Sequence, residues 1–241
     1  MTDDVIPEAH APRLSEELPH TVDDLLMNLF CRQLSVDDHN PLWLFVCETA
    51  IGLAHPLVKI VGLSLEDVSA LCDEARGNGV LNVANINSSE QIIISGEKAL
   101  IEKAASLAEA KGARKVVPLK VSGSWHCDLM KTAEEGMAAT LSATEIRDPG
   151  IPVIANVTGD YEKTADEVRG NLVKQICNPV RWARSMERMV GDGVTRAVES
   201  GPGTVLRGLM RRISKDVKTV SVGDLKTLEK AVEADKGGDD S

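Results

Sequence analysis

Aromatic side chains, positive charge and long apolar runs are all scarce in this sequence of 241 residues. Two Phe, three Trp and one Tyr are too few for a platform on which nucleic-acid bases stack. Lys and Arg number 27 against 37 Asp and Glu, so a net charge of −10 gives no general attraction to nucleic acids or anionic membranes. No apolar run reaches the roughly 18 residues of a membrane-spanning helix. We therefore expect neither a nucleic-acid partner nor a membrane.

Metal-binding and disulfide patterns are missing as well. The five cysteines and five histidines are scattered, with no C-x-x-C pair and no zinc spacing. An odd number of cysteines gives no disulfide framework. The first residues are acidic and no apolar run follows them, so they do not resemble a secretion signal. We therefore expect a cytoplasmic protein with reduced thiols and no bound metal.

The composition, 43% hydrophobic and 27% charged, is that of a globular protein. The chain changes character near residue 56. The head, residues 1–56, is acidic at its start and shows no clear helical or strand period. Pro7, Pro12 and Pro19 interrupt any regular element there. We expect an atypical, partly disordered head followed by a folded region.

From residue 57 the sequence alternates between strand-like and helix-like patterns. Strands are predicted at 57–62, 80–85, 91–95 and 115–121. Ser64 begins one helix through a capping box, and Gly112 ends another over 99–111. The apolar stripe expected for this second helix is Leu100, Ala104 and Leu107. The order β-α-β-β-α-β predicts a ferredoxin-like unit over 57–121.

The period changes after this unit. Helices are predicted at 127–142, 165–175, 179–189 and 204–213, and strands at 152–157, 194–199 and 217–222. Alternating strands and helices predict a mostly parallel sheet covered by helices over residues 122–222. A short helix at 225–232 is expected within the terminal segment 223–241. The predicted fold class is therefore α/β.

The first candidate for chemistry is His126, which follows a strand at the start of a helix. Loops at strand ends are where catalytic residues of α/β proteins lie, and imidazole titrates near neutral pH, so His126 is a candidate general base. One histidine in a loop is a weak signal, and a structural or capping histidine remains the alternative.

Five segments, in order, resemble those of one known family. They are VANINSSEQIIISG at 83–96, VSGSWHCDLM at 121–130, PVIANVT at 152–158, QICNPVRW at 175–182 and ESGPGTVL at 199–206. They are similar to "ANxNsxxQxVISG", "VSgpFHsplM", "PVisNvt", "QltspVrW" and "EiGPGkvL" of the malonyl-CoA:acyl carrier protein transacylases. The resemblance covers roughly 57–230. It implies the family's ferredoxin-like small subdomain plus a partial α/β-hydrolase-like parallel-sheet subdomain, the C-terminal part of the acyltransferase subdomain.

The resemblance also implies an activity, [acyl-carrier-protein] S-malonyltransferase. In this family a serine takes malonyl from coenzyme A and passes it to the thiol of acyl carrier protein, which feeds fatty acid or polyketide biosynthesis. His126 would be the general base, oriented by a backbone carbonyl in the loop that contains Gln175 and Asn178. Asn85 and Asn87 would face the substrate cleft. Malonyl-CoA and acyl carrier protein would be the partners, and the coenzyme A thioester is a substrate, with no prosthetic group implied.

The sequence departs from the family at the nucleophile. No G-x-S-x-G is present, and neither "GQGSQ" nor the expected "RG" precedes the small subdomain. Ser64 lies in G-L-S-L-E, which lacks the second glycine, so we interpret it as a helix cap rather than a nucleophile. Cys127 beside His126 is a weaker alternative nucleophile. Residues 1–56 do not resemble the family's first half, and we expect a truncated or frame-disrupted member.

Three interpretations of function therefore stay open. The chain could perform malonyl transfer with His126 as base, bind acyl carrier or acyl-CoA without catalysis, or be one half of a split enzyme whose separate N-terminal half carries the serine. Arg207, Arg211 and Arg212 form either a solvated face or a contact for acyl carrier protein or coenzyme A phosphates. The Gly201–Gly203 loop is either a packing turn or an anion-binding loop.

Overall fold

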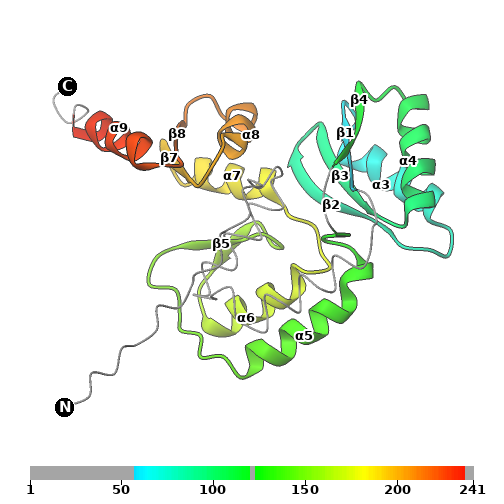
Figure 1. The fold of residues 1–241 in the computed structure, drawn as a ribbon, viewed down its shortest axis with the longest axis horizontal. Helices are drawn as coiled ribbons and strands as arrows, with labels where there is room; N and C mark the ends of the chain where they lie inside the picture. The colour runs from blue at the N-terminus through cyan, green and yellow to red at the C-terminus, as the bar shows by residue number, and fades with distance from the viewer. Residues whose placement is uncertain (1–56, 120–122, 237–241) are drawn as a thin grey trace, which may run out of the picture.

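The computed structural model describes residues 57–119 and 123–236 and shows a mixed α/β chain. Its first part runs β1 (Leu57–Val61), α3 (Leu65–Arg76), β2 (Leu81–Ser88), β3 (Gln91–Gly96), α4 (Lys98–Ala110) and β4 (Lys115–Leu119). The four strands form one antiparallel sheet in the order β2-β3-β1-β4, and both helices pack on one face of it (Figure 1). The order of elements over this part is the one that the sequence predicts.

The two helices of this part can each be compared with the sequence prediction. The Ser64 hydroxyl caps α3 by accepting a hydrogen bond from the Asp67 amide at 3.1 Å, as the capping-box pattern predicts. The buried face of helix α4 is rotated about the helix axis relative to the predicted one. Ile101, Ala104 and Ala108 are its buried residues, while Leu100 and Leu107 lie at the margin of the core. The predicted stripe was therefore right at Ala104 and wrong at Leu100 and Leu107, because packing against α3 selects the neighbouring apolar face of α4.

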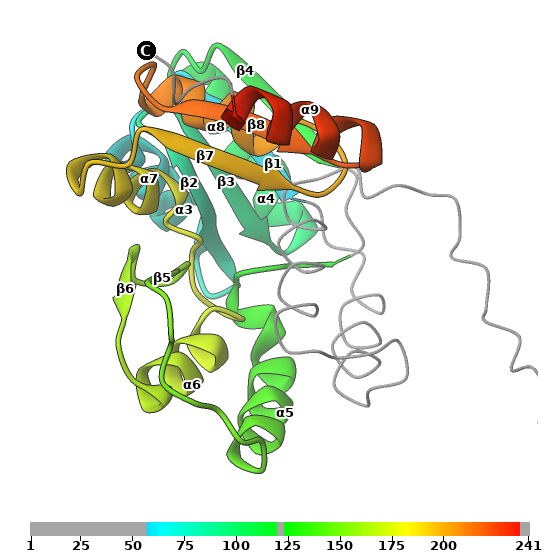
Figure 2. The same cartoon turned by 90° about the vertical axis from the view of Figure 1, so that its left-hand side faces the viewer.

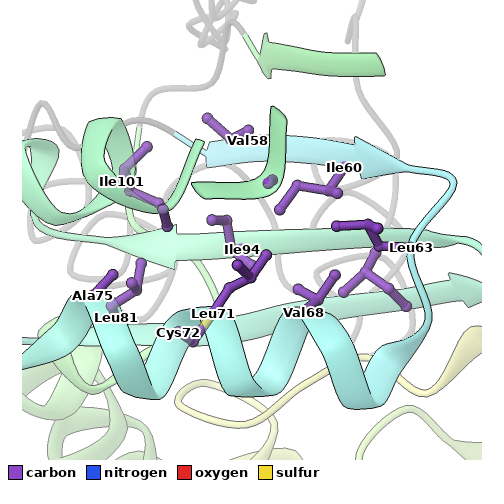
Figure 3. Packing of buried hydrophobic residues seen from close by; sticks show 13 residues of the cluster. Val58, Ile60, Leu63, Val68, Leu71, Cys72, Ala75, Leu81, Ile94 and Ile101 are labelled. Atoms are coloured by element: carbon purple, nitrogen blue, oxygen red, sulfur yellow. The ribbon is translucent and has the colours of Figure 1, made fainter. Parts of the chain in front are cut away.

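The core of the first part lies between the sheet and its two helices. Successive residues of β1 point to opposite faces of the sheet. Val58 and Ile60 pack with the helices (Figure 3), and Leu57 packs on the opposite face. Gly96 ends β3 at a close approach of two chain segments. A Cβ atom there would lie 2.3 Å from the Val80 carbonyl oxygen, so only glycine fits.

The second part contains three small groups of elements. The first is the 3-10 turn η1 (Asp128–Met130), α5 (Lys131–Ser142), β5 (Val153–Ala155), β6 (Asp160–Glu162) and α6 (Ala165–Lys174), in which α5 packs against α6. The second is α7 (Trp182–Gly191), which packs against β2. The third is β7 (Arg196–Ser200), α8 (Val205–Ile213), β8 (Lys218–Val222) and α9 (Leu225–Lys236). Figure 2 shows α5 and α6 side by side, apart from α7, α8 and α9.

The predicted mostly parallel sheet is not what the described residues form. Among the described strands only β7 and β8 pair in parallel, whereas β5 pairs antiparallel with β6, a strand that the sequence did not predict. The reason is a tight turn. The Gly159 amide donates to the Ala155 carbonyl at 2.8 Å, and Gly159 has φ +62°, which sends the chain back beside β5.

Helix α7 begins at Trp182, three residues later than predicted. Val180 is held in an extended segment beside β2, because its amide donates to Ala84 and its carbonyl accepts from the Ile86 amide, each at 2.8 Å. This pairing occupies the residues that would have formed the first helical turn. At the other end of the chain, α9 runs past the predicted end at residue 232 to Lys236.

Several expectations fall outside the described residues. The head, residues 1–56, the segment 120–122 at the predicted end of β4, and the tail from residue 237 are among them. In the part of the chain that the structure describes, no helix is both long enough and apolar enough to cross a membrane. The same residues hold no cluster of three or more His, Cys, Asp or Glu side chains that could bind a metal ion.

Candidate active site

His126 has an unusual backbone. Its φ is +60°, and among the described residues it is the only non-glycine residue with positive φ. The left-handed region costs an L-residue about 1–2 kcal/mol, and such strain persists only where the surroundings hold it. Here the neighbouring side chains of Trp125 and Cys127 are both buried and fix the loop on either side. The histidine side chain itself is only partly buried.

The imidazole of His126 is oriented by a main-chain carbonyl. Nδ1 lies 2.7 Å from the carbonyl oxygen of Gln175. A carbonyl oxygen can only accept, so Nδ1 must carry the hydrogen and donate it. Nε2 of the neutral ring is then the nitrogen with an available lone pair. This is the arrangement of a general base held by a hydrogen bond on its far nitrogen.

Gln175 can offer this carbonyl because it ends a helix. It is the C-cap of α6, whose N-terminus has a complete capping box formed by Thr164 and Glu167. The Gln175 amide still donates to the Asn171 carbonyl at 3.0 Å, but its own carbonyl lies beyond the helical hydrogen bonds. Asn178 bonds the Lys174 carbonyl at 2.8 Å through its side chain. Asn178 therefore secures the end of α6 and makes no hydrogen bond to His126.

Asn85 and Asn87 lie on β2 and are almost fully enclosed, with 0% and 1% of their surface exposed. Asn85 pairs with Val180 in a parallel bridge, which joins β2 to the segment that follows Gln175. Both side-chain polar atoms of Asn87 lack a hydrogen-bond partner within the described residues. The structure therefore joins Asn85 to the histidine-orienting segment, and it exposes neither asparagine.

The described residues contain no side-chain nucleophile hydrogen-bonded to His126. The Ser64 hydroxyl is engaged with Asp67 at the start of α3, and Ser95 and Ser124 are fully buried. Burial raises the pKa of the Cys127 thiol, whose Sγ lies 3.2 Å from the Ser124 carbonyl. A buried neutral thiol is inert, which argues against Cys127 as the nucleophile.

The loop at Gly201–Gly203 leads into α8, and a carboxylate of this chain occupies the start of that helix. Glu199 is buried and accepts from the amides of Leu206 at 2.8 Å and Arg207 at 3.1 Å. It also accepts from the Ser221 hydroxyl at 2.8 Å. The helix N-terminus is therefore already satisfied by an internal anion, which favours the packing-turn interpretation of this loop.

A second feature is a basic hollow of about 530 Å³ beside β1 and β4. Its cationic lining residues are Lys59, Arg114, Lys115 and Arg212. Arg114 forms an ion pair with Glu90, and Arg212 bonds Gln91. Lys59 and Lys115 have no ion-pair partner within the described residues. Sequence reasoning found only Arg212, because the other three gather through the pairing of β1 with β4.

Several known proteins resemble this chain. No family model matches it. It is 36% identical over 186 residues to the malonyl CoA-acyl carrier protein transacylase of Bacillus subtilis, covering 77% of this chain and 59% of that relative. It is 41% identical over 169 residues to the Haemophilus influenzae protein of the same name, covering 70% and 54%. The chain thus spans between about half and three-fifths of the length of these curated relatives.

Solved structures of proteins with the same activity in their names are also similar to this chain. The acyl-carrier-protein S-malonyltransferase of Bartonella henselae matches with a TM-score of 0.77 and 33% identity, over 85% of this chain and 67% of that one. The Vibrio cholerae acyl carrier protein S-malonyltransferase matches with a TM-score of 0.75 and 35% identity, over 80% and 63%. The fold is therefore that of the acyltransferase class. Within this class, the chain belongs to the malonyl-CoA:acyl carrier protein transacylase family.

Proposed function

We propose that this chain supplies the general base for malonyl transfer from coenzyme A to acyl carrier protein, with His126 as that base. The observation that carries the proposal is the 2.7 Å contact from His126 Nδ1 to the Gln175 carbonyl, which leaves Nε2 available. The second support is family membership, which rests on similarity over most of this chain. The reaction would feed fatty acid or polyketide synthesis in the cytoplasm.

The chemistry follows from the lone pair on Nε2. A serine hydroxyl attacks the malonyl thioester carbonyl while Nε2 takes the hydroxyl proton. The tetrahedral intermediate expels the coenzyme A thiolate, which takes that proton back from the imidazolium. The thiol of acyl carrier protein then attacks the malonyl-serine ester by the same steps, with the proton passing through Nε2 again. We propose that the serine comes from sequence equivalent to the family's first half, because no G-x-S-x-G is present here.

The division of the chain follows the same proposal. We assign 57–121 to the ferredoxin-like small subdomain, because its strand order and two-helix face have that topology. We assign 122–222 to the C-terminal part of the acyltransferase subdomain, where β7-α8-β8 is a parallel crossover unit. Asn85 then acts by supporting the loop at Val180, and neither Asn85 nor Asn87 contacts substrate, since both are buried.

The basic hollow is the surface we propose for the carrier protein. Lys59 and Lys115 present two uncompensated charges on adjacent strands, and an acidic carrier is the complementary partner. A related solved structure, with 35% identity and a TM-score of 0.76, is a type II polyketide synthase acyl-carrier protein in complex with its malonyl-transacylase. A Lys115→Glu variant should weaken carrier binding about ten-fold at low salt. Lys226→Glu on α9, outside the hollow, makes the same charge change and should have little effect.

Covalent malonylation tests the catalytic proposal. The full chain is incubated with malonyl-CoA, alone and with the first half of the Bacillus subtilis relative, and intact mass is measured for both polypeptides. We expect a malonyl adduct on the added half only when this chain is present, and none when this chain carries His126→Ala. Ser64→Ala is the matched control, because it removes a serine hydroxyl that only caps α3.

Each other outcome is informative. A malonyl adduct on this chain alone would show that it contains its own nucleophile. Carrier binding with no adduct under any condition, from folded protein, would contradict the catalytic proposal and favour a binding fragment. A malonyl adduct that still forms when this chain carries His126→Ala would show that His126 is not the general base.

A further inference from the structure

Asn156 touches both ends of the segment that orients His126. It follows β5, and its side-chain Nδ2 donates to Gln175 Oε1 at 3.2 Å. Its main-chain carbonyl accepts from the Arg181 amide at 2.8 Å. We propose that Asn156 is a positioning residue that fixes the Gln175 carbonyl and thereby selects the His126 tautomer with hydrogen on Nδ1. The meaning of this tautomer for catalysis rests on the proposed function, but the tautomer itself does not.

The far end of the segment is firmly held. The Arg181 side chain donates from Nε to the Val157 carbonyl at 3.0 Å, beside the main-chain bond from its amide to Asn156. Val180 is bonded to β2 through both its amide and its carbonyl. These contacts belong mostly to the main chain, so they are insensitive to the side chain at 156. Through these two bonds, Arg181 holds the loop.

The near end of the segment is less constrained. Gln175 is the cap of α6, and its amide donates to the Asn171 carbonyl. The peptide plane that holds the Gln175 carbonyl also contains the Ile176 amide, which donates to the Val173 carbonyl at 3.2 Å. Within the described residues, the hydrogen bond from Asn156 is the only one made by the Gln175 side chain. Helix ends fray, and a carbonyl there turns with its peptide plane. The bond from Asn156 is therefore the side-chain contact that adds to the Ile176 amide bond in opposing such rotation at Gln175.

A rotated carbonyl would change the histidine directly. Hydrogen bonds weaken steeply as their angle closes, so a turn of the peptide plane would break the contact at Nδ1. The ring, which is only partly buried, would then exchange its hydrogen between the two nitrogens. In a triad, a carboxylate side chain gives this orientation. Here it depends on the peptide plane, and Asn156 braces that plane.

The test is the nitrogen-15 spectrum of the His126 ring in the full chain, recorded where the ring is neutral. We expect the native chain to show hydrogen predominantly on Nδ1. Asn156→Leu removes the amide donor at similar volume, and Gln175→Leu removes its acceptor while keeping the Gln175 main chain. Each should lower the ratio of the Nδ1–H to the Nε2–H form roughly two- to ten-fold, as expected for loss of one hydrogen bond. The double variant should add little to either single change.

The control separates positioning from stability. Asn171→Leu on α6 removes a comparable amide bond, from Asn171 Nδ2 to Glu162 Oε1 at 2.9 Å, and should lower the melting temperature without changing the tautomer ratio. Asn156→Asp should retain the native ratio, because the Gln175 amide can turn and donate to the new carboxylate. An unchanged ratio in folded Asn156→Leu or Gln175→Leu would overturn the proposal. Should one of these variants unfold, the other carries the test. Failure of malonylation would leave this result standing.

Discussion

Asn85 and Val180 form a parallel β-bridge that joins the antiparallel sheet to the loop beside His126. Two main-chain hydrogen bonds flank it, one between Val180 and Ala84 and one between Ile86 and Val180, each of 2.8 Å. This is the point at which the two parts of the described chain share main-chain hydrogen bonds near the histidine. It makes the position of the loop depend on the integrity of β2.

The bridge can be weakened by one substitution. Val180→Pro removes the amide that donates to Ala84 and should cost about 1–3 kcal/mol of unfolding free energy. Hydrogen exchange at the Ile86 amide should quicken by about ten-fold, because its acceptor is then less fixed. Val180→Ala is the matched control, since it trims the same buried side chain but keeps both main-chain bonds. Equal exchange rates in the two variants would contradict a role for the bridge.

The left-handed conformation of His126 predicts an inverted preference for glycine. His126→Gly should be more stable than His126→Ala by about 1 kcal/mol, because glycine adopts positive φ without penalty. At Asp128, which does not have positive φ, the Gly variant should be the less stable of the two. Urea unfolding of the four variants gives the comparison. A common order at both positions would mean that His126 is not strained in solution.

We expect Glu199 to be a principal stabilising group of the unit formed by β7, α8 and β8. Glu199→Ala should destabilise the chain by about 2–4 kcal/mol, because two amides of α8 and the Ser221 hydroxyl would lose a buried charged acceptor. Glu187→Ala, on the exposed face of α7, should change stability by less than about 0.5 kcal/mol. Chemical denaturation measures both. Similar losses for the two variants would contradict this account.

Glu162 predicts a pH dependence of stability. Burial raises the pKa of its carboxyl above the ordinary value of 4.5, despite a hydrogen bond from Asn171 that lowers it. The folded state therefore holds this proton more tightly than the unfolded state does, so stability is lost as the pH rises from about 4.5 through the folded pKa. Glu162→Gln should remove this component and gain stability relative to the native chain between pH 4.5 and 7. The exposed Glu187→Gln should show no such trend, and parallel pH profiles would disprove the assignment.

Local signals in the sequence were sufficient for much of the fold. Ser64 caps α3 as its capping box predicts, and the elements of 57–119 follow in the predicted order. Periodicity could not choose between neighbouring apolar faces of α4, where Ile101 and Ala108 are buried in place of Leu100 and Leu107. That choice depends on α3, which is distant in sequence. The hairpin at Gly159 was missed because β6 spans three residues, Asp160–Glu162, too few to show an alternating pattern.

The candidate site, like the fold, could be predicted from the sequence only in part. The position of His126 and its resemblance to a family motif pointed to a base, and the Gln175 carbonyl lies where that resemblance implies an acceptor. Asn156 could not be found from the sequence, because its contact with Gln175 spans 19 positions and involves an ordinary amide. The basic hollow was missed for a related reason. Lys59 and Lys115 come together only when β1 and β4 pair.

The acceptor for His126 belongs to the peptide backbone, and this has an evolutionary consequence. Every amino acid carries a main-chain carbonyl, so no single codon change at position 175 can delete the acceptor. Mutations that abolish the contact would instead fall among the residues that set the path of the loop. A substitution at position 175 can weaken the contact, as proposed for Gln175→Leu, but it cannot remove the acceptor as loss of the aspartate does in a conventional triad. A search for conserved acidic partners of the histidine would overlook this site.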